Sequence, residues 1–197
     1  MARSKAEIRR FKLERDIQNM WFIDIEASDG GPDAMPIEIG SARIAGPDGE
    51  RRTYWCGSLI KPDPSWTQIW SPHAERVHGI PRSALQSAQP ARIIALNTFN
   101  QLSLAGRIIV SDSPGNDQPW LDRLLSTIGK EDQIRIISVW EALNGRVEQD
   151  NLVRMKEWLR ENKGPHRAGP DAARLAQSVI ECHLTPREPE PEISPEP

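Results

Sequence analysis

Short apolar runs alternate with longer stretches of helical spacing along most of the chain. Five apolar runs have the length of strands, and five stretches repeat apolar residues as amphipathic helices do. The predicted strands are residues 20–25, 37–44, 51–60, 107–111 and 133–138. The predicted helices are residues 6–18, 92–104, 117–128, 148–161 and 169–182. Three strands followed by alternating helices and strands predict a mixed α/β sheet with helices on its faces.

Turn-forming residues mark where several of these elements begin and end. The sequence Gly-Pro-Asp-Gly at 46–49 predicts a turn, so that the second and third strands form a hairpin. Residues 61–90 are rich in Pro, Trp, Ser and His, which predicts a loop with short helical turns. Asn116 is expected to cap the helix that begins at Asp117. Pro170 is expected at the first position of the last helix, where its missing N–H costs nothing.

Both ends of the chain differ in composition from its middle. Residues 1–18 hold six basic and three acidic side chains, which predicts a basic helical arm that could grip a phosphate backbone or simply form a solvated helix face. Residues 185–197 alternate Pro and Glu and are expected to be disordered. The folded domain is therefore expected to span residues 19–184, which is long enough for a real core.

Composition excludes several classes of protein. The 197 residues carry a net charge of −3, which argues against a strongly basic coat for nucleic acid. No run of 18 apolar residues occurs, and the basic start of the chain is not followed by an apolar segment, so neither a membrane span nor a secretory signal is expected. Cys56 and Cys182 cannot form a disulfide scaffold and fit no zinc motif. A reducing cytoplasm is the expected location.

Two carboxylates close the first predicted strand. Asp24 and Glu26 lie two residues apart, so their side chains point to the same face. Such a pair at the end of an apolar strand is costly unless a cation neutralises it, and hard divalent cations such as Mg²⁺ prefer oxygen ligands. Asp-x-Glu alone is common by chance, and a solvated strand end is its more ordinary explanation.

Three further residues follow at the ends of later elements. Asp117 and Asp171 lie at the starts of predicted helices, where interaction with the helix dipole is an ordinary reason for an acid. His166 precedes Asp171 by five residues in a loop, and a loop histidine is usually a surface group. A histidine that reaches over a metal site is, however, the natural general base at neutral pH. The order of these groups, each at an element end, favours a functional site.

In this combination the sequence resembles the DEDDh 3′–5′ exonucleases, the superfamily of the proofreading subunit of bacterial DNA polymerase III, ribonuclease T and oligoribonuclease. The resemblance covers residues 20–181. Its motifs are Phe-Ile-Asp-Ile-Glu-Ala-Ser at 22–28 with Pro-Ile-Glu-Ile-Gly-Ser-Ala at 36–42, Val-His-Gly-Ile at 77–80 followed by Leu85, the segment 110–121, and His-Arg-Ala-Gly-Pro-Asp-Ala at 166–172.

The second motif departs from the family pattern. A His-Asn pair is common there before the aspartate, and this chain has Asp112 and Ser113 in its place. Asp112 is thus a rival to Asp117, which we retain because Trp120 and Leu121 follow it in the family's register. An unusual loop, Asp-Gly-Gly-Pro-Asp at 29–33, bears on substrate preference.

The resemblance implies a ribonuclease H-like five-stranded mixed sheet flanked by helices. It also implies a 3′–5′ exonuclease that releases nucleoside 5′-monophosphates from single-stranded RNA or DNA, and a possible homodimer. Two Mg²⁺ or Mn²⁺ ions would be held by four carboxylates, and His166 would be the general base. The implied metal ligands are Asp24, Glu26, Asp117 and Asp171, and the implied substrate-binding residues are Ala27, Ser28, His78 and Trp120.

Some alternatives remain open at this stage. A catalytically silent exonuclease-like domain could bind nucleic acid or a protein partner, and a structural α/β domain could dock through its tail. The choice between RNA and DNA rests on a 2′-OH contact that the motifs do not reveal. Three tryptophans near the Pro-rich segment could stack on bases, although packing over the sheet is the more ordinary role. They are Trp55, Trp66 and Trp70.

Overall fold

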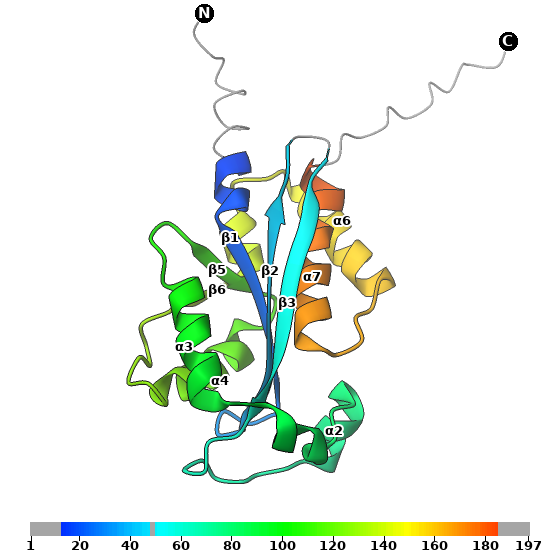
Figure 1. The fold of residues 1–197 in the computed structure, drawn as a ribbon. Helices are drawn as coiled ribbons and strands as arrows, with labels where there is room; N and C mark the ends of the chain where they lie inside the picture. The colour runs from blue at the N-terminus through cyan, green and yellow to red at the C-terminus, as the bar shows by residue number, and fades with distance from the viewer. Residues whose placement is uncertain (1–12, 48–49, 185–197) are drawn as a thin grey trace, which may run out of the picture.

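A computed structural model of the protein describes residues 13–47 and 50–184. Its centre is one mixed sheet of six strands in the order β4-β3-β2-β1-β5-β6 (Figure 1). The first three strands run antiparallel, whereas β5 pairs parallel with both β1 and β6. The strands are β1 Met20–Ala27, β2 Pro36–Ala45, β3 Arg52–Lys61, β4 Gln89–Pro90, β5 Ile108–Ser111 and β6 Ile136–Ser138.

This architecture confirms the predicted fold class and the hairpin of the second and third strands. The sheet has one strand more than expected, because the two residues of β4 pair with the end of β3. So short a strand has no apolar run by which a sequence could reveal it. The predicted helical turns in residues 61–90 are present as α2, Pro72–His78, and the 3₁₀ helix η1, Arg82–Ser87.

Helices cover both faces of the sheet. In Figure 1, α3 and α4 lie on one side, and α6 and α7 lie on the other. Two separate apolar cores result, one beneath α3 and α4 around Ile23 and Leu121, and one beneath α7 around Phe22 and Leu175. The helices are α3 Ala91–Leu102, α4 Pro114–Ser126, α5 Val139–Leu143, α6 Gln149–Glu161 and α7 Ala168–Val179, which continues as the π-helix η2, Ile180–Leu184.

Two predicted helix starts were wrong. Helix α4 begins at Pro114 after Ser113, so Asn116 lies inside the first turn and its side-chain amide donates to the Ser113 hydroxyl at 3.1 Å. Helix α7 begins at Ala168, which puts Pro170 at its third position. Any of the first few helical positions tolerates proline, because their N–H groups have no partner within the helix.

The ends of the chain test little of the predicted domain organisation. Residues 13–18 are helical, as expected, but the rest of the predicted basic arm and the Pro/Glu-rich tail fall outside the described residues. Among the residues that the structure describes, no helix is both long and apolar enough to cross a membrane.

Gly40 lets α7 lie directly on the sheet. It pairs with Asp24 on one side and with Gly57 on the other. A Cβ at Gly40 would overlap the backbone of Ala168 and Gly169 at the start of α7. A Cβ at Gly57 would lie 3.4 Å from Gly169, which is nearly ordinary contact. This close approach holds the start of α7 over the part of β1 that carries Asp24.

We therefore expect Gly40→Ala to destabilise the protein by about 1–3 kcal/mol, the usual cost of overpacking a filled interior. Gly57→Ala is the matched control, because it adds the same methyl group on the neighbouring strand with much less overlap. Thermal unfolding of both variants measures the difference. Equal melting temperatures for the two variants would contradict the close packing of α7 at Gly40.

Candidate metal and active site

Three carboxylates from two distant parts of the chain meet on one face of the sheet. Asp24 and Glu26 point to the same face of β1, and Asp171 lies in the first turn of α7, which covers that face. One oxygen from each of the three lies within 4.8 Å of the others. The structure thus brings together residues 147 positions apart in a cluster of oxygen donors that suits a hard divalent cation.

Asp117 lies beside this cluster but outside the group defined by that distance. It is 2% exposed, and its Oδ1 accepts a hydrogen bond from the Ile25 backbone N–H at 3.2 Å, between Asp24 and Glu26 on the chain. Its Oδ2 is buried and has no hydrogen-bond partner of ordinary geometry among the described residues, although the nearby Ser111 hydroxyl lowers the pKa of Asp117 somewhat. An unpaired buried oxygen fits a ligand that is yet to bind.

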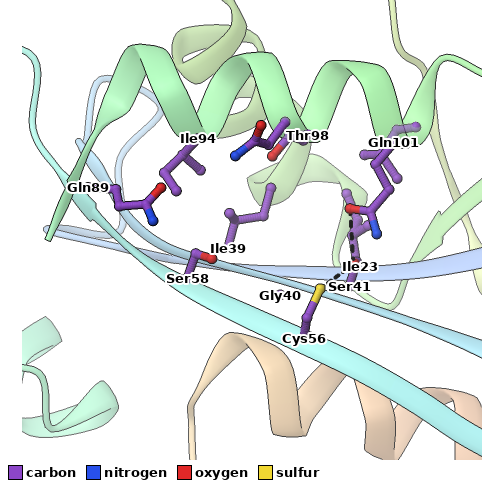
Figure 2. Close-up of a pocket in the computed structure, with 12 residues that line it drawn as sticks. Ile23, Ile39, Gly40, Ser41, Cys56, Ser58, Gln89, Ile94, Thr98 and Gln101 are labelled. Carbon is purple, nitrogen blue, oxygen red and sulfur yellow. Dashed lines mark hydrogen bonds between the residues drawn. The ribbon is translucent and has the colours of Figure 1, made fainter.

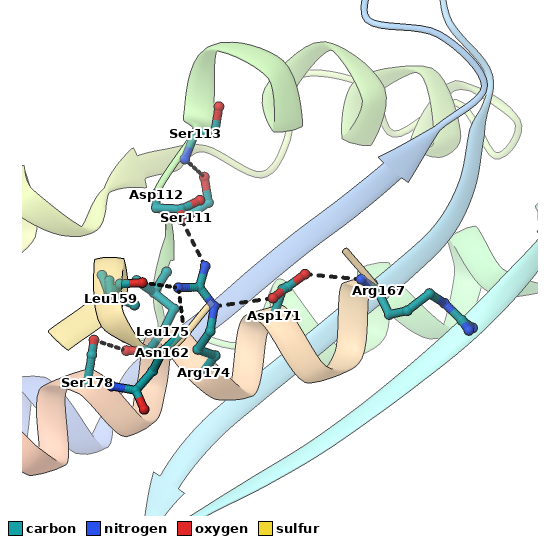
Figure 3. Close-up of polar contacts among 10 residues, drawn as sticks. All are labelled: Ser111, Asp112, Ser113, Leu159, Asn162, Arg167, Asp171, Arg174, Leu175 and Ser178. Atoms are coloured by element: carbon teal, nitrogen blue, oxygen red, sulfur yellow. Dashed lines mark hydrogen bonds and ion pairs between the residues drawn. The ribbon is translucent and has the colours of Figure 1, made fainter. Parts of the chain in front are cut away.

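The rival Asp112 has a different environment. Its side chain is 38% exposed, and Oδ2 lies 3.9 Å from the guanidinium of Arg174 (Figure 3). Among the charges that raise the pKa of Asp24, Asp117 comes first and Asp112 comes last. The geometry therefore favours Asp117 over Asp112 as the fourth member of the cluster.

Burial and mutual repulsion make these carboxylates hard to ionise. The pKa of Asp24 is raised well above its usual value, first by burial and then by the charges of Asp117, Glu26 and Asp171. Burial, followed by the charge of Asp171, raises the pKa of Glu26 to about 7. Burial raises the pKa of Asp117 to about 7 as well. Repelling acids held together in this way are expected where a cation supplies the missing charge.

Asp117 and Asp171 occupy the same position in their helices. Ser113 directly precedes α4 and Arg167 directly precedes α7, and each aspartate follows that residue by four positions. In both helices the aspartate backbone N–H donates to the carbonyl of the preceding residue. The two bonds measure 3.1 Å from Asp117 to Ser113 and 2.9 Å from Asp171 to Arg167. Both carboxylates thus lie in a first helical turn, where the helix dipole favours their ionised form.

Asp171 is fixed by two arginine residues. Its Oδ2 accepts a hydrogen bond from the Arg167 backbone N–H at 3.0 Å, and its Oδ1 accepts one from Arg174 Nε at 3.2 Å (Figure 3). Arg174 also donates to the carbonyl of Leu159 at 3.2 Å, near the end of α6. Arg174 was not among the residues predicted from sequence, although its place three residues after Asp171 on a helix makes the two side chains neighbours.

His166 belongs to the loop that joins α6 to α7. Its side chain is exposed, and its backbone has a φ of 54°, a conformation that few residues other than glycine adopt. The loop is tightly placed on either side of it. A Cβ at Gly164 would overlap the carboxylate of Asp171, and Arg167 is bound to the sheet. The contacts of Gly164 and Arg167 therefore keep the backbone of His166 next to the acidic cluster.

Glu38 and Arg167 form the bond that holds this loop. Glu38 lies opposite Glu26 in the sheet and is 4% exposed. Its carboxylate accepts hydrogen bonds from Arg167 Nε at 2.9 Å and Nη2 at 2.5 Å, and from the Ala168 backbone N–H at 2.9 Å. Glu38 was predicted from sequence only as part of a motif and without a role of its own. Its place between Ile37 and Ile39 in an apolar strand indicates that the Glu38 carboxylate is buried and needs a partner.

The expected substrate-binding residues lie around the end of β1. Ala27 and Ser28 are buried, and Ser28 closes the 29–34 loop through two bonds with Met35. His78 is 3% exposed, accepts a hydrogen bond from the Ile80 backbone N–H at Nδ1, and has a pKa lowered by burial. Trp120 is 9% exposed, and its indole N–H donates to the carbonyl of Gly31 at 2.9 Å. Their contact with substrate stays a prediction.

The three tryptophans of the sequence analysis have three different environments. Trp66 is buried in the core beneath α3 and α4, and Trp70 is half-buried at the edge of that core. Trp55 is 53% exposed, and its ring lies where a Cβ on Gly169 would be. Packing explains Trp66 fully, whereas Trp55 and Trp70 keep surface that a ligand can reach.

A separate cavity of about 180 Å³ lies between α3 and the strands β1 to β3 (Figure 2). The Ser41 hydroxyl in it lies 3.3 Å from the Cys56 thiol and 3.5 Å from Gln101 Oε1. Ser41 follows Gly40 on β2, so it points to the face opposite the carboxylates. The cavity is therefore not part of the acidic site.

No protein-family model and no curated protein sequence matches this chain. Solved structures do match it. E. coli exonuclease I in complex with a dA16 oligonucleotide is 13% identical, with 83% of this chain and 41% of that chain covered and a TM-score of 0.58. The zinc-bound form of an E. coli exonuclease I complex with single-stranded DNA is 14% identical, with 83% and 40% covered and a TM-score of 0.59. An exonuclease I from Methylocaldum szegediense is 16% identical, with 83% and 40% covered and a TM-score of 0.55.

The chain spans about two fifths of the length of these structures. Identities this low show a shared fold. The shared fold with these exonuclease I structures confirms the fold class that the motifs of the sequence imply.

Proposed function

We propose that this chain, whose fold matches about two fifths of exonuclease I, is a divalent-metal-dependent 3′–5′ exonuclease that removes nucleoside 5′-monophosphates from single-stranded ends. The observation that carries this proposal is the meeting of Asp24, Glu26 and Asp171 within 4.8 Å on that fold. These are the residues that the DEDDh motifs single out, together with Asp117 beside them.

The donor set fits Mg²⁺ or Mn²⁺. All four groups offer carboxylate oxygens, which hard cations prefer, and the unpaired Oδ2 of Asp117 and the raised pKa values of Asp24 and Glu26 leave the cluster short of positive charge. A pair of bound ions would lower the pKa of water and stabilise the charge that develops on the phosphodiester. Asp24, Glu26 and Asp171 would hold the ions together with the neighbouring Asp117.

His166 would be the general base. An imidazole nitrogen would accept the proton of the attacking water, and exposure of the ring to solvent lets that proton leave. The Glu38–Arg167 pair and the close contact of Gly164 with Asp171 would restrict the loop, so that the ring returns to one place over the cluster. Ser28 and His78 would border the terminal nucleotide.

One observation favours a second candidate, a catalytically silent domain that binds nucleic acid. Both oxygens of Asp171 are already engaged, by the guanidinium of Arg174 and by the backbone N–H of Arg167. Arg174 could therefore supply part of the positive charge that an ion supplies in an active enzyme. A silent domain would bind single strands without shortening them.

A gel assay separates the two candidates. Single-stranded RNA and DNA of one sequence, each labelled at the 5′ end, are incubated with Mg²⁺ or with EDTA. We expect wild-type protein with Mg²⁺ to give a ladder of one-nucleotide steps, and Asp24→Ala to give none. Asp63→Ala is the matched control, because that aspartate binds Ser65 in an exposed loop. Binding without a ladder would support the silent domain, and a ladder from Asp24→Ala would contradict the assigned site.

A further inference from the structure

We propose that a pocket beside the acidic cluster binds a nucleotide of the substrate strand upstream of its 3′ end. The pocket has a volume of about 380 Å³ and lies between the end of β3, the loop before α2, and η1. The inference rests on the proposed function, since it assigns a second contact to the same single strand. The volume falls in the usual range for small-molecule sites of about 300–1,000 Å³, whereas the cavity at Cys56 does not.

The pocket combines an apolar floor with an aromatic wall. Met35 and Leu85 line it and are buried, so they offer an apolar surface to a flat ring. Trp70 forms the wall, and its orientation is fixed because its indole N–H donates to Glu75 at 2.6 Å. The Trp70 ring also meets the ring of His78 edge to face, with centroids 6.2 Å apart. Bases bind such surfaces without regard to sequence, because every base has a π-face.

Positive charge borders the same space. Lys61 and Arg82 line the pocket and are exposed, and no acidic side chain is among its described lining residues. The Arg82 guanidinium lies 5.8 Å from the centre of the Trp70 ring and 3.5 Å from Gln68 Oε1. Two cations beside an aromatic ring suit a phosphate attached to a base. The amides of Gln68 and Gln86 add groups that hydrogen-bond to base edges.

Ser28 connects the wall of the pocket to the end of β1, the strand that carries Asp24 and Glu26. Two bonds connect the pocket wall to this residue, from the Ser71 backbone N–H to the Ser28 carbonyl at 2.8 Å and from the Met35 backbone N–H to the Ser28 hydroxyl at 2.9 Å. Ser28 follows Glu26 by two residues, and Ser71 follows Trp70 directly. A strand whose terminal nucleotide lies at the cluster would reach the pocket with a nucleotide further upstream.

The test compares substrates that reach the pocket with one that does not. Degradation of a ten-nucleotide oligothymidylate and of the p-nitrophenyl ester of thymidine 5′-monophosphate, which has no upstream nucleotide, is measured with wild type, Lys61→Ala and Arg82→Ala. Lys130→Ala is the matched control, because Lys130 lies 5.4 Å from the ring of Phe99 and does not line the pocket. On the ten-nucleotide substrate we expect KM to rise about tenfold in each pocket variant, as loss of one charge-assisted contact implies, with kcat within about twofold. KM for the nitrophenyl ester should not change.

Binding of the fluorescein-labelled ten-nucleotide strand in EDTA gives a second measurement. Each pocket variant should reduce the slope of log K against log salt concentration by about 0.7, the value for one phosphate contact on a single strand. Variants that match Lys130→Ala in both KM and slope would overturn the pocket and leave the proposed function standing. Equal losses on both substrates would also overturn it. If wild type gave no ladder, the proposed function would fail, and the salt slope alone would decide the pocket.

Discussion

Replacing Asp24 with asparagine should lower exonuclease activity by about 10³-fold or more. Loss of a residue that only orients a metal ligand typically costs 10–100-fold, and Asp24 lies at the centre of the cluster, where Asp117, Glu26 and Asp171 all act on its pKa. Asparagine keeps the shape of the side chain and removes the charge, so the fold should survive. The measurement is the rate of nucleotide release with saturating Mg²⁺.

The same assay decides between the two aspartates of the second motif. Asp117→Asn should cost as much activity as Asp171→Asn, because both lie in first helical turns that face β1. Asp112→Asn should cost less than about tenfold, since that exposed side chain pairs with Arg174 at a distance where an ion pair contributes little. A variant of Asp24 with wild-type turnover would remove that residue from the ligand set. A large loss in Asp112→Asn would exchange the roles of the two aspartates.

The spacing of apolar residues predicted most of the helices and strands, because each element must bury one or both of its faces against the rest of the protein. Strands β1, β2 and β3 and helices α3 and α6 begin and end within two residues of the expected positions. The pairing of Asp24 with Glu26 on one face also follows from sequence, because side chains alternate along a strand. Periodicity does not reveal how closely two elements approach each other in the fold.

Contacts between distant residues complete the site and were not predictable from local pattern. Asp171 reaches Asp24 only because Gly40 allows α7 to touch the sheet. Glu38 and Arg167 are 129 residues apart, and neither has a neighbour in sequence that reveals the other. The motif resemblance supplied what the physics of single elements lacked, since it specified which acids meet. Arg174 is outside those motifs, and for that reason its contact with Asp171 was missed.

The stability of the metal-free protein should fall as the pH rises from about 5 to 8. Burial raises the pKa of Glu26 and of Asp117 to about 7 in the folded protein, and the pKa of Asp24 is raised as well. The unfolded chain releases these protons near pH 4. The folded state therefore holds protons that the unfolded state has lost, and stability declines until the pH exceeds the folded pKa values. Each unit by which folding raises the pKa of one carboxyl lowers the free energy of unfolding by about 1.4 kcal/mol once the pH exceeds the folded pKa.

Divalent cations should reverse this loss at high pH and have little effect at low pH. Metal ions compete with protons for carboxylates, and they stabilise the folded state by about 2.7 kcal/mol at 100 times their dissociation constant. In a protein of this size a change of about 3 kcal/mol moves the melting temperature by roughly 6–12 °C. Melting curves at pH 5 and pH 8, with Mg²⁺ or with EDTA, measure both effects.

Asp117→Asn isolates the contribution of one buried carboxylate. In EDTA at pH 8 this variant should melt at least about 2–4 °C above wild type, which corresponds to about 1 kcal/mol in a protein of this size, because it removes a charge that is costly to bury. At pH 5 the Asp117 carboxyl is protonated in the folded wild type but is already ionised in the unfolded chain, so the variant should still melt above wild type, by a smaller margin than at pH 8. The margin should vanish only when the pH falls below about 3.5, where both states of wild type are protonated. A variant that is less stable than wild type at pH 8 would mean that Asp117 stabilises the fold, through its bond to the Ile25 N–H, more than its charge destabilises it. Melting temperatures of wild type that are independent of both pH and Mg²⁺ would show that Arg174 already neutralises the cluster, which is the behaviour of a silent domain.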